Sequence, residues 1–281
     1  MARCRRMSRD VIRHPGPAAA DPCLVAMGQG RVVRATLTGG QSLMAAVSDL
    51  MDRTGCDSGV IVVDGLTMGP YDYVMPGPSD DGIHAAWYSA THHGDHAQIR
   101  QGSAIVGRRD GAWWLHCHAI WEDAGAVKCG HLLPDDVTLP ADCAVVLYAF
   151  DGGRFEVSMN AETLFPIFHA TGGEASGNAM IVKVNPHHDI HATLSDAIRQ
   201  AGFDRARVVG IGSLIGAQFE SGPPMLAPIS EVLLLSGAVW QNGVLRLPMY
   251  CVDPDDGQFS GDILPGGAPV LITFEALVIA E

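Results

Sequence analysis

The sequence predicts a chain of strands and helices arranged as two tandem copies of one unit. Strand, helix and strand patterns follow one another in the same order before and after a small, glycine-rich segment at 170–177. Each copy then has a hairpin signal, Asp110-Gly111 in the first and Asn242-Gly243 in the second. The predicted parts are a flexible leader (1–22), a first domain (23–169), a linker (170–177) and a second domain (178–281).

The chain of 281 residues, 47% of them hydrophobic, is long enough for two domains of ordinary size. No apolar run reaches the ~20 residues that a membrane span needs. The start is basic without an apolar segment behind it, so it is not a secretory signal; a transit-type presequence is the alternative to a flexible leader. The seven cysteines lack close repeated spacing, which is typical of reduced thiols in a cytoplasm.

The charge distribution argues against nucleic-acid binding. The formal net charge is −13, and five of the 18 basic residues lie in the first thirteen positions. The remainder of the chain is therefore more acidic still, and such a surface repels a phosphate backbone. Contact with DNA would depend on the short basic arm, so we expect DNA to be an unlikely partner.

The first unit begins with a strand and a helix. Residues 31–37 alternate as in a strand, and 43–51 have the apolar spacing of a helix with Ser42 as N-cap and Gly55 as its end. Val60–Gly65 is a buried strand. Strands at 143–150 and 155–159 close the unit.

Residues 66–100 are rich in glycine, proline and polar groups, and they predict a long loop. Such a long loop is uncommon in a compact domain unless it has a function, so a lid or pocket wall is one interpretation and a solvated loop is the other. In the first interpretation His92, His93 and His96 are candidate substrate-binding residues.

The segment from His116 to His131 carries the main functional signal. If residues 113–121 form a strand, His116 and His118 point to the same face, because side chains alternate along a strand. A two-residue turn at Ala124-Gly125 would place His131 opposite His118. Three neutral nitrogen ligands with an open fourth position are typical of catalytic zinc, so the segment predicts Zn²⁺ or another divalent transition metal. The alternative is three histidines satisfied by hydrogen bonds on a half-buried sheet.

The second unit repeats the order without this chemistry. Its predicted elements are a strand at 179–184, a helix at 189–202, a strand at 208–214 and a hairpin at 231–247. Pro248-Met249-Tyr250 stands where the first unit has its two neighbouring histidines. We therefore expect the second unit to serve as a scaffold or wall beside a metal site in the first.

These motifs resemble the plants-and-prokaryotes conserved (PPC) domain, through the His-x-His pattern, Gly125 and the run Gly130-His131-Leu132-Leu133. The resemblance covers about residues 28–168 and extends to 178–281 by layout alone, as in a tandem protein with a degenerate second copy. Two departures are Cys129, where the family usually has glycine, and an acidic position that is either Asp142 or absent.

The resemblance implies an α+β fold in which each unit is a mixed, largely antiparallel β-sheet flanked by helices. It also implies similarity in fold to acetolactate decarboxylase, whose three-histidine zinc acts as a Lewis acid. Family members often form trimers, and a dimer is the alternative if the two copies pair. Carried over residue by residue, only His116, His118 and His131 match the family pattern.

Two kinds of function follow. The first is a zinc-dependent enzyme, a lyase or hydrolase acting on a small carbonyl or carboxylate compound. Glu122 and Asp123 are its acid–base candidates, and Arg109, with the neighbouring Arg108, could orient a carboxylate. Solvated surface charges are the alternative for all four residues. The second is a protein without catalysis, either a small-molecule sensor that uses the same pocket or a DNA-associated regulator.

Overall fold

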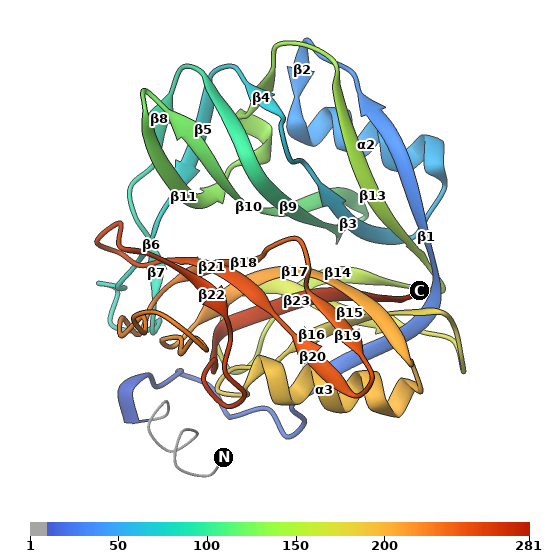
Figure 1. Ribbon diagram of the computed structural model, residues 1–281. Coiled ribbons are helices and arrows are strands. Elements are labelled where there is room, and N and C mark those ends of the chain that lie inside the picture. The colour runs from blue at the N-terminus through green and yellow to red at the C-terminus, as the bar shows by residue number, and fades with distance from the viewer. Residues whose placement is uncertain (1–9) are drawn as a thin grey trace.

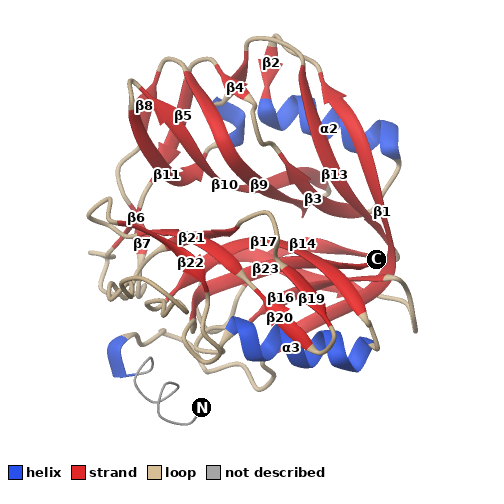
Figure 2. Cartoon of the chain, in the orientation of Figure 1, coloured by secondary structure: helices blue, strands red, loops and turns tan. Residues whose placement is uncertain are grey.

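A computed structural model describes residues 10–281 and has mostly antiparallel β-sheets with helices packed on them. Figure 1 shows two sheet layers, with α2 on the upper one and α3 beneath the lower one, and Figure 2 shows how far strands outnumber helices. The predicted largely antiparallel sheet with helices is confirmed. The one parallel bridge given for the described residues joins Glu156 to Arg108.

The first sheet has the strand order β8–β5–β11–β10–β9–β3–β13–β1, with every neighbouring pair antiparallel. Its strands are β1 (Cys23–Leu37), β3 (Ser58–Val62), β5 (Tyr71–Val74), β8 (His92–Gly94), β9 (Ala97–Arg109), β10 (Ala112–Asp123), β11 (Ala126–Leu132) and β13 (Cys143–Asp151). The central strands β9 and β10 are the longest of this sheet after β1, and β10 carries His116 and His118.

The second sheet has the order β1–β16–β23–β17–β18–β21–β22, again antiparallel. Its strands after β1 are β16 (Ala179–Val184), β17 (Arg205–Leu214), β18 (Glu231–Leu234), β19 (Val239–Gln241), β20 (Val244–Arg246), β21 (Pro248–Val252), β22 (Gln258–Asp262) and β23 (Val270–Ala280). β1 belongs to both sheets, because its first residues pair with β16 and its later ones with β13. The predicted hairpin strand at 231–240 is interrupted before β19, where Gly237 has a φ of 100°.

The segment 66–100 differs from the predicted irregular loop. It holds several short strands, and β9 begins within it at Ala97. These strands pair with partners distant in sequence, such as β5 with β11, and local composition does not reveal such pairing. The remaining short elements are β2 (Gln41–Ser42), β4 (Thr67–Met68), β6 (Pro76–Gly77), β7 (Trp87–Tyr88), η1 (Pro134–Asp136), β12 (Thr138–Leu139), β14 (Gly153–Met159) and β15 (Pro166–Gly172).

Both predicted helices are confirmed, together with their ends. α2 (Leu43–Thr54) begins after Ser42, whose side chain accepts from the Ala45 N–H, and it ends at Gly55 with a left-handed backbone. α3 (Ile190–Ala201) begins after Asp189 and ends at Gly202 in the same way. Within residues 10–281, no helix combines the length and apolar character needed to cross a membrane.

One hydrophobic core joins the inner faces of the two sheets. It contains Ile120 of β10 and Cys129 of β11 together with Leu233 of β18 and Leu277 of β23. β10 and β11 therefore lie against β18 and β21, as Figure 1 also shows. This packing brings polar side chains of the second sheet close to the β10–β11 hairpin of the first, called here the histidine hairpin because it carries His116, His118 and His131.

The predicted leader is only partly described. Residues 1–9 lie outside the described residues. Beyond them, Ile12 is buried, His14 Nε2 lies 2.8 Å from the Leu271 carbonyl, and the Ala19 N–H donates to Glu162. The flexibility of the leader and the domain boundaries at 169 and 178 stay predictions.

Candidate metal centre

Three histidines of the β10–β11 hairpin lie together on one sheet face. His118 is opposite His131, as the sequence predicts, because Ala124 and Gly125 form a two-residue turn with φ of 49° and 82°. His116 precedes His118 by two residues and shares its face. The ring centroids of the three histidine pairs are 4.6, 5.0 and 5.2 Å apart.

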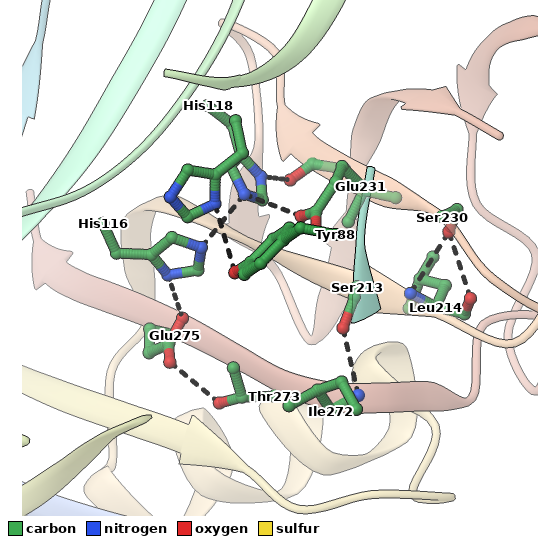
Figure 3. Close-up of polar contacts among 12 residues, drawn as sticks. Tyr88, His116, His118, Ser213, Leu214, Ser230, Glu231, Ile272, Thr273 and Glu275 are labelled. Carbon is green, nitrogen blue, oxygen red and sulfur yellow. Dashed lines mark hydrogen bonds and ion pairs between the residues drawn. The ribbon is translucent and has the colours of Figure 1, made fainter. Parts of the chain in front are cut away.

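Two glutamates of the second sheet complete the cluster. Glu231, the first residue of β18, has Oε2 2.7 Å from His118 Nε2, and Glu275 of β23 has Oε2 3.0 Å from His116 Nδ1. Figure 3 shows both carboxylates pointing at the histidines from the opposite layer. One potential ligand atom from each of the three histidines and from Glu231 lies within 4.8 Å of the others.

Hydrogen bonds decide which ring nitrogens remain available on His118 and His116. The Nδ1–H of His118 donates to the Val232 carbonyl at 2.9 Å, and the Nδ1–H of His116 donates to Glu275. In the neutral rings both Nε2 atoms then carry lone pairs, and these atoms are only 3.0 Å apart. Two lone pairs beside the Glu231 carboxylate repel one another unless a cation or a proton lies among them.

This donor set fits a divalent transition metal. Imidazole nitrogens and a carboxylate oxygen are ordinary ligands of such ions. Metal-bound histidines usually donate their other ring N–H to a carboxylate or a backbone carbonyl, as His116 and His118 do here. The residues present therefore suit the metal that the sequence predicts.

The surroundings set the proton affinity of the cluster. Burial, followed by the charges of His116 and His118, lowers the pKa of His131 well below its usual range. Burial also acts to lower the pKa of His116, but Glu275, by charge and hydrogen bond, and then Glu231 raise it overall. His131 is consequently neutral at physiological pH, whereas the two glutamates favour the protonated form of His116.

Glu275 is itself held in place. Its second oxygen, Oε1, accepts from the Thr273 hydroxyl at 2.8 Å. The fully buried Lys183 stands opposite Glu275 in the β16–β23 register, and its Nζ donates to Asn185 Oδ1 at 2.6 Å. Burial lowers the pKa of Lys183 to about 8, against the opposing charges of Glu275 and Glu162. The carboxylate that orients His116 thus has few alternative positions.

A short flap, formed by β6, β7 and the residues between them (76–88), places Tyr88 at the histidines. β6 pairs with β7, and the Ser89 side chain accepts from the Met75 N–H, which closes the flap at its base. The Tyr88 hydroxyl lies 3.4 Å from His131 Nδ1. Tyr88 as a whole is 38% exposed, but burial of its hydroxyl end, then the charges of Glu231 and Glu275, raise its pKa, so the phenol keeps its proton.

A cavity of about 460 Å³ opens beside the cluster. His116, His131, Glu231 and Glu275 contribute polar atoms to its wall. The remaining lining is largely apolar and includes four aromatic side chains, from the flap, from β10 and from the β15 region, namely Trp87, Trp114, Phe165 and Phe168. The site is therefore a polar cluster facing a largely apolar chamber.

Of the other sequence candidates, Arg109 alone lines this cavity, and its guanidinium lies 4.7 Å from the centroid of the Trp114 ring. Glu122 forms an ion pair with Arg100, and Asp123 forms one with Lys128. These two carboxylates lie outside the cavity lining.

The histidines of β8 and the residue beyond it are also outside that lining. His92 stacks on Tyr73 with ring centroids 5.0 Å apart, and His93 Nδ1 lies 2.7 Å from Asp72. His96 is exposed. His92 thus rests on an aromatic ring and His93 on a carboxylate, and the role of the three histidines in substrate binding stays a prediction.

Sequence reasoning missed Glu231, Glu275 and Tyr88. Glu275 is fully buried within the strand Val270–Ala280, whose other members are mostly apolar. A lone carboxylate in such a run is a signal, because glutamate is seldom buried without a partner. Glu231 opens a similar apolar run. Tyr88 had no comparable signal, because its position depends on the fold of the flap.

No family model matches the chain, and neither does any curated protein. A metal-containing protein from Archaeoglobus fulgidus has 20% identity and a TM-score of 0.37, over 52% of this chain and 94% of its own. A plant- and prokaryote-conserved (PPC) protein from Pyrococcus horikoshii has 15% identity and a TM-score of 0.37, over 52% and 94%. A putative DNA-binding protein from Ralstonia eutropha has 13% identity and a TM-score of 0.36, over 48% and 88%. With TM-scores this low, these likenesses assign neither fold family nor function to the chain.

Proposed function

We propose that this protein is a metal-dependent enzyme acting on a carbonyl or carboxylate compound, with zinc held by His116, His118 and His131 and by Glu231 of the second sheet. A zinc-dependent lyase or hydrolase is the reaction class that this centre would serve. The identity of the metal as zinc rests on the nitrogen-rich donor set.

One observation carries the proposal. His116 and His118 each direct a lone pair from Nε2 toward the same point, because both Nδ1–H groups are engaged by fixed acceptors. Histidines that only stabilise a fold have no need of this convergence. The Glu231 carboxylate lies at the same point, and its negative charge favours binding of a cation there over binding of a neutral molecule.

The metal, when bound, would polarise a substrate oxygen or lower the pKa of a water molecule, and that oxygen would either replace Glu231 or join the four protein groups as a further ligand. The chain's own residues supply orientation and proton transfer. The Tyr88 phenol keeps its proton beside His131, and it can donate a hydrogen bond to a developing oxyanion. Glu275 and Thr273 keep His116 in one tautomer, and a substrate packed on the aromatic walls would displace water from the reacting atoms.

We further propose that the chain consists of two PPC-like units, 23–169 and 178–281, joined at 170–177, with a fold similar to that of acetolactate decarboxylase. The strand orders support this division. The first unit contains β1–β13–β3–β9–β10–β11 and the second β16–β23–β17–β18–β21–β22, so β1 pairs with β13 as β16 pairs with β23. In this arrangement the second unit contributes Glu231 and Glu275 to the proposed centre, in addition to the scaffold role expected from its sequence.

Two functions without catalysis remain as alternatives. A small-molecule sensor would use the same centre and cavity without turnover. A DNA-associated regulator has less support, because the net charge of −13 opposes binding to phosphates. Assembly as a trimer or dimer and a cytoplasmic location belong to the same proposal.

Elemental analysis of the purified protein tests the centre. The wild type, prepared without chelators or an affinity tag, should carry about one zinc per chain, as a single site of this donor set requires. The His116→Ala, His118→Ala double variant should carry none while keeping its circular dichroism spectrum. Absence of metal from both proteins would overturn the enzyme proposal.

A further inference from the structure

We propose that the cavity beside the histidines takes an aryl-bearing carbonyl or hydroxy acid, with its oxygen-donor head at the metal centre and its aromatic body along the Trp114 wall. This deepens the proposed function and rests on it for the head group. The compact substrate expected from the sequence would leave most of the cavity empty.

The size of the cavity is the first reason. An apolar cavity of about 150 Å³ holds one benzene molecule. The cavity here, at about 460 Å³, has about three times that volume, and it falls in the range used for cofactor-sized ligands. A small acid bound at the histidines would leave apolar walls in contact with water.

The β9–β10 register gives the cavity its direction. Directly paired residues of two antiparallel strands point to the same face, so Ile105 and His116, Gly107 and Trp114, and Arg109 and Ala112 form three successive rows. Arg109 therefore lies about 14 Å along the strands from the His116 row, at ~3.4 Å per residue. The Trp114 ring occupies the middle row, between the metal centre and the turn.

Glycine at position 107 makes room for the aromatic wall. A Cβ at this position would collide with the Phe155 backbone and lie 2.7 Å from the Phe168 ring. Phe168 consequently packs directly on the strand beside Trp114, and both rings line the cavity. Trp87 of the flap packs on Phe165 with ring centroids 4.8 Å apart, which supplies a second aromatic surface.

These surfaces recognise a flat apolar group. Aromatic rings favour offset or edge-to-face contact with another ring, and burial of the ligand's ring adds a hydrophobic contribution. The Arg109 guanidinium stacks on Trp114 at the outer end, and it forms no ion pair with a carboxylate among residues 10–281. His116 and Glu275 supply polar groups in the His116 row, at the metal centre.

A hydroxamate series on the zinc-loaded protein tests the inference by calorimetry. Acetohydroxamate, benzohydroxamate and 2-naphthohydroxamate share one metal-binding head and differ in the apolar body. We expect metal-dependent binding of all three, with affinity increasing roughly tenfold or more from the first to the second and again to the third. Equal affinities would overturn the inference and leave the proposed function standing. Failure of all three to bind in a metal-dependent way would overturn both.

A pair of variants separates the cavity from general hydrophobicity. Val157→Phe adds bulk at a half-buried valine that lines the cavity, whereas Val33→Phe does so at a half-buried valine on β1 away from it. Val157→Phe should remove the gain for the naphthyl compound and leave acetohydroxamate binding unchanged. Val33→Phe should show the same increase in affinity along the three hydroxamates as the wild type. An identical series in both variants would place the aryl group elsewhere and overturn the inference.

Discussion

His118 and Glu231 come from different sheets, and their Nε2 and Oε2 atoms lie 2.7 Å apart. The neighbouring Val232 carbonyl takes the other ring nitrogen of His118 at 2.9 Å, so two successive residues of β18 engage one imidazole. The contact ties the histidine hairpin to the opposite layer. Metal binding at this point should therefore depend on both sheets.

The first prediction concerns Glu231. Glu231→Gln replaces a charged oxygen ligand with a neutral amide. Loss of a residue that only hydrogen-bonds to a metal ligand usually lowers metal affinity by ~10–100-fold, and we expect the zinc affinity of Glu231→Gln to fall by more than that. Competition with a chromophoric zinc chelator measures this change. The exposed Glu220→Gln serves as the control and should bind zinc like the wild type. Unchanged affinity in Glu231→Gln would exclude Glu231 as a ligand.

A second prediction concerns Glu275, which orients His116 without being among the proposed ligands. Glu275→Gln weakens the acceptor for His116 Nδ1–H, so zinc affinity should fall by about 10–100-fold. Thr273→Val removes only the hydroxyl that fixes this carboxylate and should cause a smaller loss in the same assay. A larger effect for Thr273→Val than for Glu275→Gln would contradict this order.

Removal of the metal should lower the thermal stability. A ligand present at about 100 times its Kd stabilises the folded state by about 2.7 kcal/mol. For a chain of this size that corresponds to a shift in Tm of several degrees. Differential scanning calorimetry before and after dialysis against a chelator measures it. The His116→Ala, His118→Ala variant should give the same Tm in both conditions, and a shift there would point to a different metal site.

Alkaline pH should destabilise the protein through Cys56. Burial, followed by the charge of Asp151, raises the pKa of this thiol from its ordinary value of 9.0 to about 11. Between these values the folded state holds a proton that the unfolded chain releases, so this contribution is complete below pH 9 and is lost as the pH rises through 11.

Urea unfolding at pH 8.5 and 10.5 checks the effect of Cys56. The free energy of unfolding should fall between these pH values by about 1–2 kcal/mol more in the wild type than in Cys56→Ala, at about 1.4 kcal/mol per pH unit when the group is fully titrating. Equal falls in the two proteins would show that this thiol titrates alike in the folded and unfolded states.

The helix caps give a prediction independent of the metal. Ser42→Ala removes the acceptor for the Ala45 N–H and should lower the free energy of unfolding by about 1 kcal/mol. Ser48 lies within the same helix and donates to the Met44 carbonyl, a contact that adds little to helix stability. Ser48→Ala should therefore be nearly neutral in the same urea titration, and an equal loss in both variants would contradict a capping role.

The sequence by itself determined the features that depend on neighbouring residues. The glycine and serine at the ends of α2 fix its limits through local hydrogen bonds. The turn at Ala124-Gly125 fixes the hairpin register and, through it, the approach of His131 to His118, because a two-residue turn permits one pairing of the strands.

Only the tertiary structure decided which groups face those histidines. Glu231 and Glu275 are 100 or more positions away, and their place beside the histidines depends on two sheets packing face to face around a shared apolar core. The strands within 66–100 likewise form because partners elsewhere satisfy their backbone groups. The local sequence pattern specifies a helix or a strand, whereas the burial of its apolar face decides which other elements it packs against. In this chain the histidine hairpin is buried against a sheet that carries Glu231 and Glu275.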